Sequence, residues 1–104
     1  MTIAELPIKI DREKLAKFCR DRKIRKLSLF GSVLRRDFDP ARSDVDMLVE
    51  FSPDESLSLL EFIGYQFELG EMVGRRVDLV EPDHLSKYYR NEVLREAIPI
   101  YEQA

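Results

Sequence analysis

Three short apolar segments, each closed by residues that interrupt regular structure, constrain most strongly what this chain can fold into. Each has the length and the mix of β-branched, aromatic and aliphatic residues that a strand requires. The first segment is followed by Gly31, the second by Ser52-Pro53 and the third by Glu81-Pro82. The sequence therefore predicts strands over residues 26–30, 44–51 and 76–80.

The segments around these strands have helical character. Asp11 is a suitable N-cap for a helix over residues 12–22, whose inner face carries Leu15, Phe18 and Cys19. We expect a short helical turn over 32–36, a long helix over 57–73 that ends at Gly74, and a last helix that Asp83 caps and that runs to about Ala97. The stretch 37–43 is predicted to be a loop, and residues 98–101 close the chain.

This order of elements predicts an α/β or α+β fold, a small mixed β-sheet flanked by helices, in one domain over residues 1–104. The apolar stripe of the long helix is predicted to be core: Leu59, Leu60, Ile63 and Phe67. Phe62, Tyr65 and Leu69 lie off that stripe, which leaves open an exposed apolar face for a partner or for self-association in a homo- or hetero-oligomer. At least one of Tyr88 and Tyr89 is also expected in the core.

The bulk properties exclude several classes of protein. A formal net charge of −3 gives no overall attraction to nucleic acid, so no direct nucleic-acid partner is expected. No apolar segment approaches the roughly 20 residues that cross a bilayer, so no membrane partner is expected either. The single cysteine, Cys19, excludes an internal disulfide and is expected to be a buried structural thiol. These features predict a cytoplasmic protein.

Two aspartates, Asp44 and Asp46, begin the second predicted strand two residues apart. Residues at this spacing in a strand point to the same face, so the two carboxylates lie side by side and repel. A divalent cation with a preference for oxygen, Mg²⁺ or Mn²⁺, removes this conflict. Asp78 offers a third carboxylate in a strand that could lie beside the second, and three such groups could hold two metal ions. The alternative is that Asp44 caps a turn and the others are edge-strand charges.

Gly31-Ser32 supplies a complementary feature between the first strand and the predicted helical turn. Glycine lets a phosphate approach the backbone closely, and the N–H groups at the start of a helical turn point at an anion. The hydroxyl of Ser32 can add one more donor. Together with the Asp44–Asp46 pair, the sequence predicts a phosphate-binding turn that faces a metal site.

These motifs resemble those of a known family. Two segments resemble the signature of the DNA polymerase β-like nucleotidyltransferases, and within them that of the minimal nucleotidyltransferases (MNT). They are Leu29-Phe30-Gly31-Ser32-Val33-Leu34-Arg35 and, after it, Ser43-Asp44-Val45-Asp46-Met47-Leu48-Val49. Residues 76–80 stand where that family carries its third aspartate, and residues 94–101 resemble the usual end of MNT proteins. Two features depart from the pattern: Arg36 rather than glycine follows Arg35, and the segment from Ser32 to Asp44 is slightly longer than the common form.

The resemblance implies a polymerase β-like fold and a role for each motif residue. Gly31 and Ser32 would hold the triphosphate of ATP, and Arg35 would contact phosphate or brace the loop. Asp44 and Asp46 would bind two Mg²⁺ ions, or Mn²⁺ in their place. Asp78 would complete the shell of the catalytic metal and help to activate the attacking hydroxyl.

The resemblance also implies a partner, because MNT proteins of this kind are commonly antitoxins paired with HEPN-domain ribonuclease toxins. Such an antitoxin transfers AMP from ATP to a tyrosine of the toxin and releases pyrophosphate. Two alternatives remain open: a non-catalytic antitoxin that neutralises the toxin by binding, and a nucleotidyltransferase of a small molecule.

Overall fold

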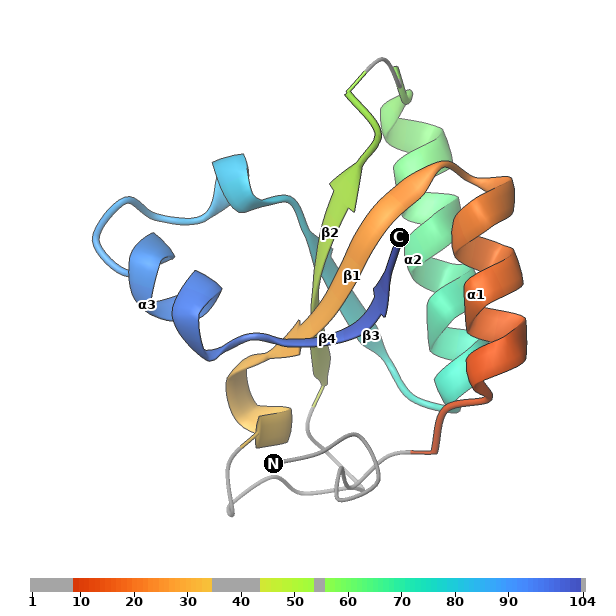
Figure 1. The fold of residues 1–104 in the computed structure, drawn as a ribbon, viewed down its shortest axis with the longest axis horizontal. Helices are drawn as coiled ribbons and strands as arrows, with labels where there is room; N and C mark the ends of the chain where they lie inside the picture. Colours follow the sequence, from red (N-terminus) through yellow and green to blue (C-terminus); the bar gives the residue numbers. More distant parts are fainter. Residues whose placement is uncertain (1–8, 35–43, 54–55, 104) are drawn as a thin grey trace.

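The structure, a computed structural model, describes residues 9–34, 44–53 and 56–103. It is an α+β fold with a four-stranded mixed sheet in the order β3-β2-β1-β4 (Figure 1). In chain order the elements are α1 (Arg12–Asp21), β1 (Ile24–Phe30), the 3₁₀ turn η2 (Gly31–Leu34), β2 (Val45–Phe51), α2 (Leu59–Val73), β3 (Val77–Val80), the 3₁₀ turn η3 (Pro82–His84), α3 (Arg90–Glu96) and β4 (Ile98–Glu102). The predicted fold class is confirmed.

The sheet has one face covered by two helices and one face that stays more open. β1 pairs antiparallel with both β2 and β4, whereas β2 and β3 run parallel. Figure 1 shows α1 and α2 side by side against one face and α3 on the other side of the sheet. Val45, Met47 and Val49 join the core with residues of α1 and α2. Because side chains alternate along a strand, the even-numbered residues of β2 face the side of α3.

Helix α1 forms as expected. The Asp11 carboxylate accepts hydrogen bonds from the backbone N–H groups of Glu13 and Lys14, at 3.1 and 3.2 Å. Leu15, Phe18 and Cys19 are buried. Burial raises the pKa of the Cys19 thiol to about 12, although the nearby Arg22 guanidinium acts to lower it. A thiol with so high a pKa carries almost no thiolate near neutral pH, so Cys19 is a structural residue rather than a nucleophile.

Helix α2 corrects the prediction of which face is buried. The stripe expected in the core is exposed: Leu59 is 75%, Leu60 80%, Ile63 50% and Phe67 67% accessible. Leu69 and Val73 are buried instead, and Phe62, Tyr65 and Met72 pack against the core. Both stripes are apolar, so periodicity alone could not choose between them. Ser58 and Glu61 form a capping box at the start of the helix, and Gly74, with φ +71°, ends it as predicted.

The C-terminal region differs most from expectation. Asp83 does not cap a long last helix: η3 ends at His84, and α3 begins only at Arg90. Tyr88 and Tyr89 are 88% and 49% accessible, so neither tyrosine lies in the core, and Leu85 is buried in their place. Residues 98–102 form a fourth strand that the sequence analysis missed. The described part of the chain contains no helix long and apolar enough to cross a membrane.

Candidate functional site

Asp46 and Asp78 lie next to each other on the open face of the sheet. They are direct partners in the parallel pairing of β2 with β3, as are Val45 and Val77. Partners in a parallel ladder point to the same face, so the two carboxylates project from adjacent strands on the same side. The sequence analysis placed Asp78 only in a strand that could neighbour the second one. The pairing confirms that the two strands are neighbours.

Asp44 lies two residues before Asp46, beside the segment that leads into β3. The backbone N–H of Val45 donates a 2.9 Å hydrogen bond to the carbonyl oxygen of Arg76, which aligns Asp44 with Arg76 just before the two strands begin. The Oδ2 atom of Asp44 lies 4.0 Å from the Nε atom of Arg76. This region therefore holds three carboxylates and one guanidinium: Asp46 and Asp78 on the paired strands, and Asp44 and Arg76 just before them.

Gly31 brings the predicted phosphate-binding turn against this region. Phe30 is the partner of Asp46 in the antiparallel pairing of β1 and β2, so Gly31 leaves β1 beside Asp46. A Cβ atom on Gly31 would overlap the Oδ2 atom of Asp46 and lie 3.3 Å from its Cγ atom. Gly31 also has a φ of +77°, and it opens the turn η2. A glycine is therefore required here both by conformation and by the approach of the Asp46 carboxylate.

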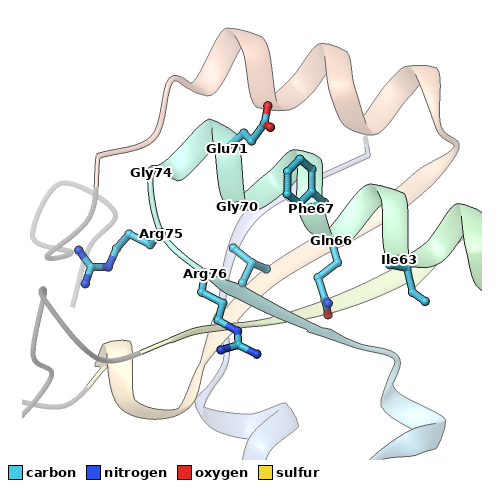
Figure 2. Close-up of a pocket in the computed structure, with 9 residues that line it drawn as sticks. Ile63, Gln66, Phe67, Gly70, Glu71, Gly74, Arg75 and Arg76 are labelled. Atoms are coloured by element: carbon cyan, nitrogen blue, oxygen red, sulfur yellow. The ribbon is translucent and has the colours of Figure 1, made fainter.

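Two cavities are each lined in part by a residue of this region, Gly31 in one and Arg76 in the other. One, of about 550 Å³, lies between the start of η2 and one face of α3, and is lined by Phe30, Gly31, Leu34, Tyr89, Glu92, Val93, Glu96 and Ile98. The other, of about 540 Å³, lies between α2 and the start of β3. Figure 2 shows this second cavity with Phe67 and Ile63 on α2 and with Arg75 and Arg76 on the segment that enters β3.

The donor set fits Mg²⁺ that is shared with a bound phosphate. Among the described residues, no three acidic, histidine or cysteine side chains group closely enough to form a complete metal cluster. Mg²⁺ in phosphoryl-transfer sites is bound by one or two carboxylates together with substrate phosphates, rather than by a cage made only of protein ligands. The close pair Asp46 and Asp78, the half-exposed Asp44 and the adjoining Gly31 turn have this character.

The structure thus places Gly31, Asp44, Asp46 and Asp78 near one another, and their roles in metal and nucleotide binding stay a prediction. The side chain of Ser32 and the whole of Arg35 lie outside the described residues. Arg76 was not predicted as a site residue. Its position two residues before Asp78 in the same predicted strand, which puts both side chains on one face, was the signal that could have found it.

Residues 12–100 match the family model for the nucleotidyltransferase domain. The chain belongs to the nucleotidyltransferase family. This nucleotidyltransferase is 40% identical over 75 residues to the protein adenylyltransferase MntA of Thermococcus cleftensis, a match that covers 72% of this chain and 73% of the relative.

Solved structures place the nucleotidyltransferase among the minimal members of the family. One, described as a putative minimal nucleotidyltransferase, is 35% identical and has a TM-score of 0.63 over 85% of this chain and 87% of its own. Another is the tri-AMPylated HEPN toxin of Shewanella oneidensis in complex with MNT antitoxin. It matches 88% of this chain and 70% of that one, at 22% identity and a TM-score of 0.61. At that identity the likeness shows the fold alone.

Proposed function

We propose that this nucleotidyltransferase is the antitoxin of a HEPN/MNT pair and transfers AMP from ATP to a tyrosine of its toxin partner. The observation that carries the proposal is the contact between Gly31 and Asp46, because it joins a phosphate-binding turn to a pair of carboxylates in register. The name of the Thermococcus relative supports a protein as acceptor, and the Shewanella complex supports a HEPN toxin as that protein.

The chemistry assigned to each residue follows from its place in the site. The backbone N–H groups of η2, with the hydroxyl of Ser32, hold the triphosphate, and Arg35 contacts phosphate or braces the loop. Asp44, Asp46 and Asp78 hold two Mg²⁺ ions, which supply charge neutralisation at the phosphates and orient the leaving group. Asp78 lies on the edge strand β3, where a protein substrate has access. Its carboxylate accepts a hydrogen bond from the tyrosine hydroxyl that attacks.

The reaction is a displacement at the α-phosphorus of ATP. The tyrosine hydroxyl gives its proton to the Asp78 carboxylate, and its oxygen bonds to that phosphorus. The bond from the α-phosphorus to the oxygen that bridges it to the β-phosphorus breaks, and pyrophosphate leaves with that oxygen. The side chains of the site position the reactants and stabilise charge and form no covalent bond to the substrate. The new phosphodiester adds negative charge and bulk at a surface where the ribonuclease must admit RNA.

A binding antitoxin without catalysis is the second candidate, and the apolar surface of α2 offers a place for the toxin to bind. Leu59, Leu60, Ile63 and Phe67 are all at least half exposed on one helix. An apolar patch of this kind marks a surface that associates with another macromolecule. Such a surface serves either mechanism, so a direct measurement of transfer must separate the two.

The test is incubation of the protein with α-³²P-labelled ATP, Mg²⁺ and the HEPN partner, followed by mass spectrometry of the labelled protein. We expect label on a tyrosine of the partner, and we expect Asp44→Asn and Asp46→Asn each to lower the transfer rate roughly 100-fold or more. Asp83→Asn makes the same chemical change at an exposed position outside the site and should leave the rate unchanged. Neutralisation of the toxin that persists in both site variants would instead establish the binding antitoxin.

A further inference from the structure

Arg76 is a cation that lies beside one of the three aspartates, Asp44, and nothing in the proposed mechanism uses it. Its carbonyl oxygen is fixed by the N–H of Val45, at 2.9 Å, so the start of its side chain is anchored beside Asp44. Its guanidinium is 4.0 Å from the Asp44 carboxylate. Figure 2 shows the side chains of Arg75 and Arg76 pointing in different directions.

The contact between Arg76 and Asp44 is too weak to be a structural ion pair. The side chain of Arg76 is 83% accessible and that of Asp44 is 40% accessible. Exposed pairs of this kind contribute little to stability, because water screens the attraction and two side chains lose freedom to make it. The guanidinium is therefore free to change partner when another anion or cation enters the site.

The position of Arg76 relative to Gly31 indicates which anion it meets. Gly31 follows β1, on one side of β2, and Arg76 precedes β3, on the other side. Asp44 and Asp46 stand between them. A polyphosphate that extends from the η2 turn across these two carboxylates reaches Arg76 and Asp78 at its far end. A guanidinium offers several N–H donors in a fixed plane, which suits the oxygens of a phosphate.

We propose that Arg76 is a phosphate-binding residue of the active site that serves as the counterion of Asp44 only while metal and nucleotide are absent. When they bind, the guanidinium leaves Asp44 and donates to a non-bridging phosphate oxygen on the Asp78 side of the site. This inference rests on the proposed function, because it assigns Arg76 to the same nucleotide. It predicts that Arg76 opposes metal binding and favours nucleotide binding.

The test measures the two ligands separately on Arg76→Ala. Without nucleotide, Mn²⁺ binding followed by electron paramagnetic resonance should become roughly three- to tenfold tighter, because a positive charge beside the metal has been removed. With saturating Mg²⁺, the affinity for a non-hydrolysable ATP analogue should fall about tenfold or more, because a charge-assisted hydrogen bond has been lost. Arg20→Ala removes the same charge from the exposed end of α1 and should change neither affinity.

Arg76→Lys keeps the positive charge without the planar fork of donors. We expect its Mn²⁺ affinity to stay near that of the unmutated chain while its affinity for the analogue is reduced. This variant keeps the test decisive if Arg76→Ala lowers the unfolding temperature. Unchanged affinities in Arg76→Ala, or a loss of both together in a variant that unfolds normally, would overturn the assignment of Arg76 alone. Failure of the unmutated chain to bind Mn²⁺ and the analogue would overturn the proposed function as well.

Discussion

Gly31 is held in place by two requirements that act on a single residue. Its φ of +77° lies in the region that residues with a side chain adopt at a cost of about 1–2 kcal/mol. Its Cα atom also faces the Asp46 carboxylate so closely that a methyl group cannot be added without moving that carboxylate. The same geometry that makes the turn suitable for phosphate therefore ties the position of Asp46 to the conformation of Gly31.

We predict that Gly31→Ala lowers the free energy of unfolding by roughly 2 kcal/mol or more and lowers AMP transfer in parallel, because Asp46 must turn away. Urea denaturation measures the first effect. Gly64→Ala is the matched control, since a Cβ atom there meets nothing within 4 Å on the surface of α2. It should stabilise the protein by about 0.5–1 kcal/mol. A Gly31→Ala variant as stable as the unmutated protein would contradict the contact with Asp46.

Helix α2 has two apolar faces with different roles. One face packs against the sheet and α1 through the buried Leu69 and Val73 and the partly buried Phe62 and Tyr65. The ring of Tyr65 contacts that of Phe18 edge-on, with 6.1 Å between the ring centroids. The opposite face leaves Leu60 and Phe67 in solvent. The capping box of Ser58 and Glu61 and the terminal Gly74 determine where the helix begins and ends. They do not determine which face of the helix is buried, so that choice depends on packing.

The two faces of α2 should respond differently to truncation. Leu69→Ala removes a fully buried side chain and should cost about 2–5 kcal/mol of unfolding free energy. Phe67→Ala, on the exposed face, should cost less than about 1 kcal/mol despite the larger side chain. Chemical denaturation of the isolated protein checks both variants. A larger loss in Phe67→Ala than in Leu69→Ala would mean that α2 packs with the other face inward.

At the scale of the whole molecule, stability is concentrated at the centre of the sheet. β1 pairs with a strand on each side, and Leu27 and Leu29 are fully buried within it. α3, in contrast, contains no buried residue and has no side-chain hydrogen bond at its N-cap. The site lies between these regions: its carboxylates stand on the rigid sheet, whereas the cavity beside Gly31 is walled by α3.

Native-state hydrogen exchange should resolve this difference in local stability between β1 and α3. Amides of β1, such as those of Leu27 and Leu29, should exchange only through global unfolding, whereas those of α3 should exchange through local opening that costs much less free energy. The denaturant dependence of each amide distinguishes the two routes. Equal protection of α3 and β1 would contradict the weak attachment of α3. The amides of β2, also paired on both sides, serve as the internal standard.

The sequence by itself determined the features that depend on neighbours along the chain. Asp11 and Gly74 were identified as helix ends because capping is local, and Asp44 and Asp46 were placed on one face because a strand alternates with a period of two. The order Gly-Ser, Asp-x-Asp and later Asp indicated a single site through its resemblance to a family. The family itself is confirmed by the match over residues 12–100.

Only the tertiary structure decided what depends on contacts between distant segments. The buried face of α2 was settled by the sheet and α1, because both of its stripes are apolar and local pattern assigns no preference between them. Residues 98–102 became a strand because β1 offers them an open edge to pair with. Arg76 entered the site because the parallel register of β2 and β3 aligns it with Asp44. Spacing along the chain puts Arg76 on the same face as Asp78, but its alignment with Asp44 depends on which strand pairs with β3, a contact between distant segments.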